Sequence, residues 1–183
     1  FDIWMRLLTK VENSVLWLRK SNKLSHINMK NEAQKRNIDP SRLVFADKVP
    51  MDEHLARQRL ADLFVDTFAF NAHTTAADAL WAGLPLVTKI GLGFAGRVAG
   101  SLLNAVGLPE LVTETEQDYE ALILELATNP TKLTKIKEKL ANNRLSQPLF
   151  NTKLYTTHLE NGFIQAYQNY FDGNLPQTII VPK

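Results

Sequence analysis

The sequence predicts an α/β protein built on a doubly wound parallel sheet. Short, nearly continuous apolar runs alternate with segments of helical apolar spacing, and Gly, Pro and Asn stand between them. Continuous apolar runs are typical of parallel strands that are covered on both faces. Parallel strands joined through helices need right-handed crossovers, which place helices on both faces of a sheet. Beyond residue 129 the pattern changes to helices only.

Five strands and eight helices are expected in chain order. The expected strands cover residues 14–18, 42–46, 63–65, 86–88 and 110–112. The expected helices cover residues 1–8, 26–37, 52–61, 74–82, 99–105, 117–127, 131–144 and 152–171. A polar loop is expected over residues 19–25, and an extended tail over residues 176–183.

Local residues support these boundaries. Asn13 separates the first helix from the first strand. Pro40 disfavours helical geometry in the residue before it, so the second helix ends at about Asn37. Gly83 is a typical stop for the helix over residues 74–82. The first helix starts at Phe1 without a cap or an initiator Met, which is typical of the middle of a longer protein.

Composition narrows the class of protein. The net charge of +2 comes from 21 basic and 19 acidic residues, a balance that argues against nucleic-acid binding. The sequence contains no Cys, which excludes disulfides and thiolate metal sites and suits a reducing compartment. No apolar run approaches the ~20 residues of a membrane span, and no secretory leader is visible. We therefore expect a cytoplasmic protein with neither a nucleic-acid nor a membrane partner.

The sharpest candidate site is the polar turn at the start of the helix over residues 74–82. His73, Thr74 and Thr75 lie where the strand-to-helix loop enters that helix. The first N–H groups of a helix lack internal partners and carry the positive end of its dipole, which makes this a phosphate-binding position. Asp78 lies one turn further on, where ribose hydroxyls are a typical partner for a carboxylate. The alternative is that one Thr only caps the helix.

A second candidate cluster follows the second strand, at the edge where such sheets bind ligands. Its members are Val49, Pro50, Met51, His54 and Arg57. His54 and Arg57 are three residues apart, so they share one helix face and offer a stacking plane and a fork of donors to a base. The alternative is a solvated helix start, in which two acidic residues answer the helix dipole.

A third pattern, from Gly91 to Gly96, matches the G-x-G-x-x-G fingerprint of dinucleotide-binding folds. It follows the fourth expected strand, however, and the acid expected ~20 residues later falls near Glu110 or Glu114, without a strand end. A flexible loop near the site is the favoured interpretation, with NAD binding as the alternative. His26 and His158 have no partner at metal-ligand spacing, so no metal site is expected.

Seven short motifs connect the sequence to a known family. They cover residues 13–18, 49–54, 60–62, 66–67, 71–88, 97–99 and 148–152. In these motifs the chain resembles the carboxyl-terminal part of the catalytic region of O-linked N-acetylglucosamine transferase and its bacterial and SPINDLY-like relatives, glycosyltransferase family 41. The likeness covers nearly the whole chain, and the block over residues 71–88 is its most specific part.

The resemblance implies a GT-B arrangement, with two Rossmann-like halves and the nucleotide sugar held mainly by the second half. This chain is similar to most of that second half. By motif, His73, Thr74 and Thr75 would hold the diphosphate, and Asp78 would bind the ribose hydroxyls.

The same resemblance assigns the second cluster to the uracil. His54 would stack near the base, Arg57 would reach it, and the backbone around Val49 and Pro50 would pair with its edge. One position departs from the family pattern, which often has Lys where this chain has Met51. The contact of that side chain with the uridine is therefore left open.

The resemblance also implies that parts of the catalytic region precede Phe1. They are a strand, a loop with a phosphate-binding Lys, the half that carries the base and acceptor contacts, and helical repeats. The absent strand would be central in the sheet, so its neighbours would be separated by a gap. We therefore expect residues 1–129 to form an incomplete Rossmann-like domain and residues 130–183 to form helices and a tail that pack on it. An isolated chain would be poorly stable, or would fill the gap with another chain or a rearranged strand.

These implications predict the nucleotide-sugar-binding half of an inverting glycosyltransferase that needs no metal or other cofactor. The donor would be UDP-N-acetylglucosamine and the acceptor a protein Ser or Thr. The catalytic base is expected outside this chain. Transfer of fucose from GDP, transfer of glucose to Asn, and a non-catalytic binding or scaffolding module are the alternatives.

Overall fold

The strands of this protein are all parallel and form two separate sheets. The computed structural model describes residues 1–181. The strands are β1 (Leu16–Arg19), β2 (Leu43–Ala46), β3 (Phe64–Val65), β4 (Leu86–Lys89) and β5 (Val112–Thr113). One sheet has the order β1-β2 and the other has the order β3-β4-β5. The predicted α/β fold with parallel strands is therefore confirmed, and no strand pairing joins the two sheets among residues 1–181.

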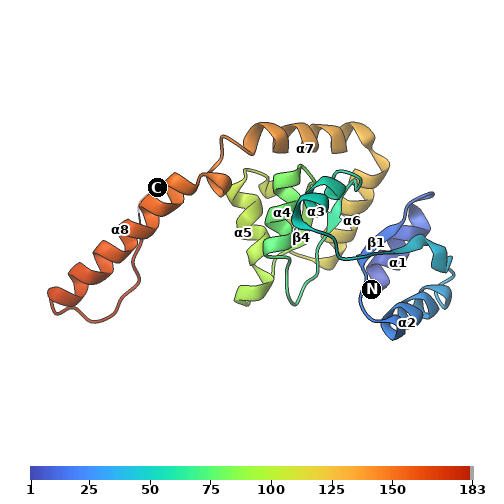
Figure 1. Ribbon diagram of the computed structural model, residues 1–183, viewed down its shortest axis with the longest axis horizontal. Helices are drawn as coiled ribbons and strands as arrows, with labels where there is room; N and C mark the ends of the chain where they lie inside the picture. Colours follow the sequence, from blue (N-terminus) through green and yellow to red (C-terminus); the bar gives the residue numbers. More distant parts are fainter. Residues whose placement is uncertain (182–183) are drawn as a thin grey trace.

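Helices alternate with the strands and then continue alone (Figure 1). They are α1 (Asp2–Lys10), α2 (Lys23–Gln34), α3 (Met51–Gln58), α4 (Thr74–Ala82), α5 (Val98–Ala105), α6 (Glu116–Thr128), α7 (Pro130–Asn143) and α8 (Thr152–Phe171). Short 3₁₀ turns cover η1 (Pro40–Arg42), η2 (Phe94–Gly96), η3 (Pro109–Leu111) and η4 (Pro148–Phe150). Within residues 1–181, no helix combines the length and apolar character needed to cross a membrane.

Some predicted boundaries were wrong by a few residues. The second helix begins at Lys23 instead of residue 26, because the Asn22 side chain caps it by accepting the Ser25 N–H at 2.8 Å. The same helix ends at Gln34, and Asn37 has the left-handed backbone that follows its last turn. The fifth strand begins at Val112, because the residues before it form η3.

The apolar core consists of two clusters. The larger cluster surrounds β3, β4 and β5; its buried members include Leu80, Leu86, Leu103, Leu111, Tyr119 and Leu126. The smaller cluster lies at β1, β2 and α2; its buried members are Met5, Leu8, Leu16, Ala33, Ile38 and Leu43. Each sheet thus has a core of its own.

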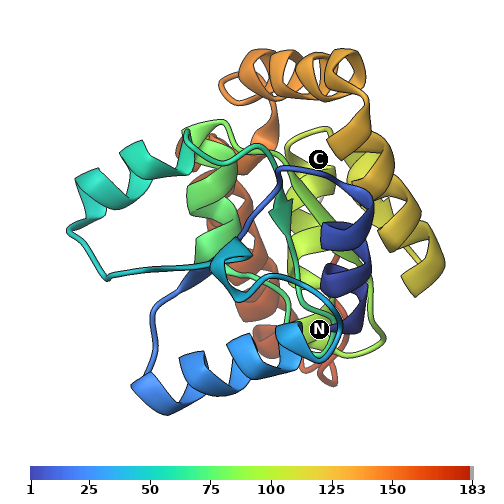
Figure 2. The same ribbon diagram turned by 90° about the vertical axis from the view of Figure 1, so that its right-hand side faces the viewer.

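Helix α1 connects the two clusters. Its Ile3 and Leu7 belong to the larger cluster, whereas Met5 and Leu8 belong to the smaller one. Figure 2 shows α1 beside α6, and the Glu120 carboxylate of α6 accepts hydrogen bonds from the Arg6 and Lys10 side chains of α1. Helix α1 therefore contributes side chains to both clusters.

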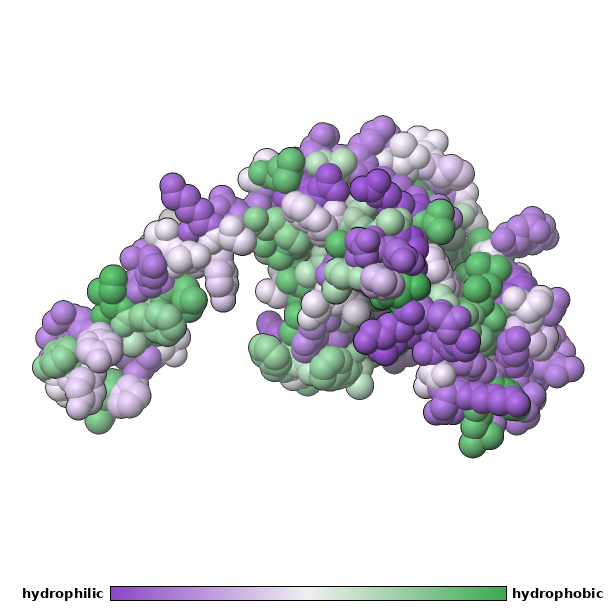
Figure 3. Space-filling model, viewed as in Figure 1, coloured by the Kyte–Doolittle hydropathy of each residue, from purple (hydrophilic) through white to green (hydrophobic). Residues whose placement is uncertain are grey.

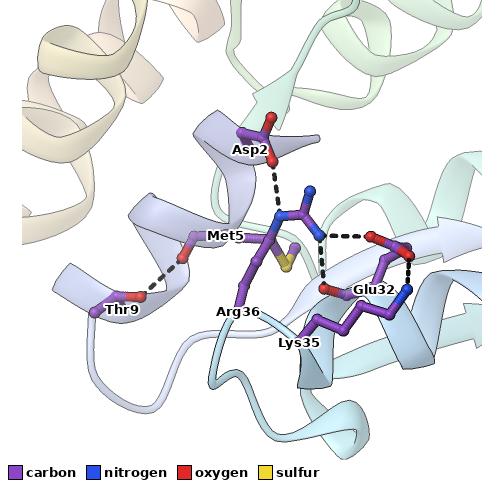
Figure 4. Close-up of polar contacts among 6 residues, drawn as sticks. All are labelled: Asp2, Met5, Thr9, Glu32, Lys35 and Arg36. Carbon is purple, nitrogen blue, oxygen red and sulfur yellow. Dashed lines mark hydrogen bonds and ion pairs between the residues drawn. The ribbon is translucent and has the colours of Figure 1, made fainter.

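A polar network ties the start of α1 to the end of α2 (Figure 4). Arg36 Nε donates to Asp2 Oδ1 at 2.7 Å, and Arg36 Nη1 donates to Glu32 Oε2 at 2.7 Å. Lys35 also pairs with Glu32 at 2.7 Å. These side chains are well exposed, so the network orients α2 and adds little stability.

The two C-terminal helices behave differently. Helix α7 lies along the body and buries Ile136 and Leu140 in the larger cluster. Helix α8 has no buried residue and projects away from the body as an arm (Figure 1). The residues after it turn back along the arm, so that a Cβ at Gly162 would lie 3.5 Å from Val181 Cγ2. Residues 182 and 183 of the expected tail lie outside the described residues, and the domain boundary at residue 129 stays a prediction.

Candidate functional site

The first turn of α4 is open to solvent at the carboxyl end of β3. Helix α4 begins at Thr74 with His73 as its N-cap residue, and no side chain caps it. Thr74 and Thr75 are exposed, and within residues 1–181 neither their backbone N–H groups nor their hydroxyls have a hydrogen-bond partner. The alternative in which a Thr caps the helix is therefore not what the structure shows. The turn presents unused donors at the positive end of a helix dipole.

Asp78 lies one turn further along α4 and is half-buried. No hydrogen bond or ion pair to its carboxylate is present among residues 1–181. The helix beneath it is well anchored, because Ala76, Ala79 and Leu80 are fully buried. At its other end, Gly83 stops α4 with a φ of +90°, as its position in the sequence predicted.

The His73 ring is held by two aromatic neighbours. It stacks on Phe70 with a centroid distance of 4.5 Å and an interplanar angle of 16°. It also meets Phe94 edge to face at 6.1 Å. His73 Nε2 lies 3.5 Å from the Ala95 carbonyl oxygen, which leaves Nδ1 for another partner. The ring thus lies beside the open first turn of α4, in contact with Phe70 and Phe94.

The loop between β3 and α4 is organised by Asp66, which is 2% exposed. Its Oδ1 accepts the backbone N–H groups of Thr67 at 2.8 Å and Ala72 at 2.7 Å. Its Oδ2 accepts the Thr88 hydroxyl at 2.6 Å. Burial raises the pKa of Asp66, while these hydrogen bonds act in the opposite direction. Asp66 has no predicted role in the sequence; the signal that could have identified it is a carboxylate placed directly after a strand.

The loop over residues 91–96 packs against this organised loop. Gly91 N–H donates to Gly96 O at 2.6 Å, and Asn71 N–H donates to Ala95 O at 2.8 Å. A Cβ on Gly96 would lie 3.1 Å from Phe68 O and 3.3 Å from Gly91 Cα. The first and last glycines of the G-x-G-x-x-G pattern are therefore explained by close backbone packing, without a dinucleotide. The loop lies beside the candidate site, as expected.

The second candidate cluster lies on α3 and the residues before it. Arg57 Nη2 lies 3.1 Å from His54 Nδ1, and Arg57 Nη1 donates to Asp47 O at 2.7 Å. Gln58 Nε2 lies 3.2 Å from His54 Nε2. Arg57 also lies over the Trp17 ring, 5.9 Å from its centroid. Both ring nitrogens of His54 thus have neighbours within the protein, and a ring face is what remains for a ligand.

The residues ahead of His54 form the start of α3. Pro50 is the N-cap residue and Met51 is the first helical residue, and both are exposed. The backbone N–H and carbonyl of Val49 have no partner among residues 1–181. Helices α3 and α4 are neighbours (Figure 1), and both begin at the carboxyl ends of parallel strands. The structure therefore brings both clusters to one edge, although no hydrogen bond joins them in the described part of the chain.

The two remaining histidines, His26 and His158, belong to neither candidate cluster. His26 stacks on Phe45 at 4.1 Å, and its Nε2 accepts the Ser21 N–H at 2.8 Å. His158 lies on the exposed arm α8. Within residues 1–181, no three His, Asp or Glu side chains gather closely enough to hold a metal ion.

Comparison with known proteins identifies the family and the fold. The sequence model of glycosyl transferase family 41 matches residues 1–159. The chain is 37% identical, over 94% of its length, to a Caenorhabditis elegans protein named UDP-N-acetylglucosamine–peptide N-acetylglucosaminyltransferase. It is 34% identical, over 96% of its length, to an Arabidopsis thaliana protein named probable UDP-N-acetylglucosamine–peptide N-acetylglucosaminyltransferase SEC. The chain spans only 15% and 18% of the length of these two proteins.

The fold is also similar to a solved structure, a mutant of the Thermobaculum terrenum O-GlcNAc transferase. The TM-score is 0.86 and the sequence identity is 27%. The match covers 92% of this chain and 33% of that chain.

Proposed function

This chain belongs to glycosyl transferase family 41, and from that premise we propose that it is the nucleotide-sugar-binding half of a protein glycosyltransferase. The reaction would move N-acetylglucosamine from UDP to a Ser or Thr hydroxyl of an acceptor protein, with inversion at the sugar and without a metal. The names of the C. elegans and A. thaliana relatives support this donor and acceptor. The observation that carries the proposal is the open first turn of α4, with the His73 ring stacked on Phe70 beside it.

At that turn the diphosphate of the donor would accept the N–H groups and hydroxyls of Thr74 and Thr75, with His73 beside them. Asp78 would accept hydrogen bonds from the ribose hydroxyls. As the bond to the sugar breaks, negative charge grows on the diphosphate, and donors already aimed at it lower the barrier. The attacking oxygen would come from the acceptor. This half of the enzyme would therefore stabilise the leaving group.

The uracil would lie toward α3. The unpaired backbone of Val49 would meet the edge of the base, with Pro50 and Met51 beside it. The free face of His54 would stack on the base. The N–H groups of Arg57 that do not bind the Asp47 carbonyl would donate to the base. Because Arg57 also holds His54 Nδ1 at 3.1 Å, the two side chains would act as one preformed unit.

Calorimetric titration with UDP tests the proposal directly. We expect UDP to bind, and Asp78→Ala to weaken binding by roughly 10- to 100-fold, because hydrogen bonds to a charged group contribute about 1.5–3 kcal/mol. Glu138→Ala is the matched control, since Glu138 is an exposed carboxylate on α7, away from the site. Unchanged affinity in Asp78→Ala would exclude the assigned role of this residue.

Titration with GDP and assays of sugar transfer separate the alternatives. A preference for GDP over UDP would favour transfer of fucose within the same family. Transfer to Asn would appear as glucose on an Asn-containing acceptor peptide. Nucleotide binding without turnover by the full-length protein on any acceptor would favour a non-catalytic module.

A further inference from the structure

We propose that Asp66 is a positioning residue for the donor site: its buried carboxylate closes the loop ahead of α4 and so holds His73 and the open helix turn in register with the sheet. The inference rests on the proposed function, because it assigns Asp66 an indirect role in holding the diphosphate.

The first step is the closure of the loop. Asp66 Oδ1 accepts the N–H of the next residue, Thr67, and the N–H of Ala72, six residues away. Ala72 directly precedes His73, the N-cap residue of α4. The position of one oxygen therefore determines where the chain enters the helix.

The second step is the attachment of this closed loop to the body. Asp66 N–H donates to Val87 O at 3.1 Å, and Thr88 Oγ1 donates to Asp66 Oδ2 at 2.6 Å, so two groups of Asp66 are bound to β4. The Asp66 carbonyl accepts the hydroxyl of Tyr119, a fully buried residue of α6, at 2.7 Å. The loop thus takes its position from the sheet and from α6.

The third step leads from the loop to the ring that faces the ligand. Thr67 Oγ1 donates to Phe70 O at 2.6 Å, and Asn71 Nδ2 donates to Thr67 O at 2.7 Å. Phe70 in turn stacks on His73. A displacement of the Asp66 carboxylate would therefore move both the backbone and the stacking partner of His73.

The chemistry of the position suits a carboxylate or its amide. Three donors converge on the two side-chain oxygens of Asp66, and a carboxylate offers acceptors only. An Asn side chain keeps one oxygen for the two backbone N–H groups, while its NH₂ can donate to the Thr88 hydroxyl, which also accepts. Ala leaves the N–H groups of Thr67 and Ala72 without this acceptor, so the loop loses both bonds that close it.

The test compares UDP affinity in four forms of the protein by calorimetry. We expect Asp66→Ala to weaken UDP binding by about tenfold or more and Asp66→Asn to stay within about threefold of the wild type. Leu140→Ala is the control for loss of stability, because Leu140 is fully buried in α7, outside the loop. It should lower the melting temperature and leave the UDP affinity unchanged.

A second pair keeps the inference testable if Asp66→Ala does not fold. Thr88→Val removes the donor to Asp66 Oδ2 without contact to the proposed ligand, whereas Thr88→Ser keeps the hydroxyl. We expect Thr88→Val to weaken UDP binding by about threefold or more and Thr88→Ser to match the wild type.

The outcomes distinguish this inference from the proposed function. If the wild type does not bind UDP, the proposed function fails first. If UDP binds but Asp66→Ala or Thr88→Val binds it as tightly as the wild type, the positioning role is wrong and the function stands. Equal weakening in Asp66→Ala and Leu140→Ala, or no rescue by Asp66→Asn, also contradicts the positioning role.

Discussion

Two glycines of this chain have opposite backbone requirements in similarly open surroundings. Gly83 has a φ of +90°, and Gly93 has a φ of −82°. A Cβ built on either residue would meet no atom within 4 Å. The difference between them is therefore conformational and not steric.

This difference predicts opposite effects of one substitution. Gly83→Ala should lower the free energy of unfolding by about 1–2 kcal/mol, because a side chain disfavours the left-handed region. Gly93→Ala should leave it unchanged or raise it by up to about 1 kcal/mol, because Ala restricts the unfolded chain. Urea unfolding of both variants measures the change in the free energy of unfolding. Equal losses at the two positions would contradict the explanation.

At the scale of single residues, features that depend on neighbours in the sequence could be predicted. The turn of His73 and the stop at Gly83 could be recognised because a helix start and a helix end each involve neighbouring residues. Asp66 could not be assigned, since Thr88 is 22 residues and Tyr119 is 53 residues away from it. The ligand roles of His73 and Asp78 were predicted from the helix start and supported by family likeness, and they stay predictions.

Among whole elements, the ion cluster between α1 and α6 predicts a pH effect. Hydrogen bonds from Arg6, and then from Lys10, lower the pKa of Glu120 below its ordinary value of 4.5. A carboxyl with a lowered pKa stabilises the fold above its ordinary pKa, and that contribution disappears as the pH falls through the lowered value. The link between the two helices is therefore strongest near neutral pH.

Glu120→Gln tests this link. Near neutral pH the variant should melt a few degrees below the wild type, and the difference should shrink well below pH 4.5. Glu138→Gln is the matched control, because Glu138 is exposed on α7 and forms no ion pair among residues 1–181. A difference that does not change with pH would show that Glu120 acts through packing alone.

The arm formed by α8 predicts that its removal is tolerated. Helix α8 buries no residue, and its Phe163 and Tyr167 side chains are exposed. Figure 3 shows hydrophobic surface along this arm. Leu149 and Phe150, by contrast, pack on the larger core cluster. A chain that ends at Asn151 should therefore keep its melting temperature within about 4 °C and gain solubility. Calorimetry and light scattering measure both effects, and loss of the cooperative transition would contradict the prediction.

Element positions were predicted better than element boundaries. Helix α4 was located from residue 74 to residue 82 as the structure has it, because an apolar pattern and a Gly stop coincide there. The start of α2 was placed too late, because the Asn22 cap lies inside a run of polar residues that was read as a loop. The direction of α8 could not be predicted, since an apolar pattern does not say which surface it contacts.

At the scale of the whole molecule, the two unequal cores should unfold separately. The smaller cluster has six buried residues and the larger has sixteen, and α1 is the helix shared between them. Less buried apolar surface means a lower free energy of local opening. In hydrogen exchange, the amides of β1 and β2 should exchange at least about tenfold faster than those of β4.

Helix α1 provides the control for this experiment. Met5→Ala affects the smaller cluster, where Met5 is 2% exposed, and should speed exchange mainly in β1 and β2. Leu7→Ala affects the larger cluster and should act mainly on the other sheet. Uniform acceleration throughout the chain in both variants would mean that the two cores unfold as one unit.

The interrupted sheet was expected from family likeness and not from the residues themselves. The parallel direction of the strands follows from the alternation of strands and helices that the sequence displays. The division of the strands into two sheets cannot be read from a single strand, because each strand is apolar whether or not it is paired on both sides. The domain boundary at residue 129 likewise depends on contacts that pattern alone does not specify.

The close packing of Gly91 and Gly96 has a consequence for natural variation. A Cβ on either residue would lie 3.3 Å from backbone atoms of the other, so a larger residue at one position requires the backbone of its partner to shift. Gly93, between them, meets no such obstacle. Among homologous sequences, positions 91 and 96 should therefore remain glycine together, while position 93 should vary. A search by glycine spacing alone would mistake this loop for a cofactor fingerprint.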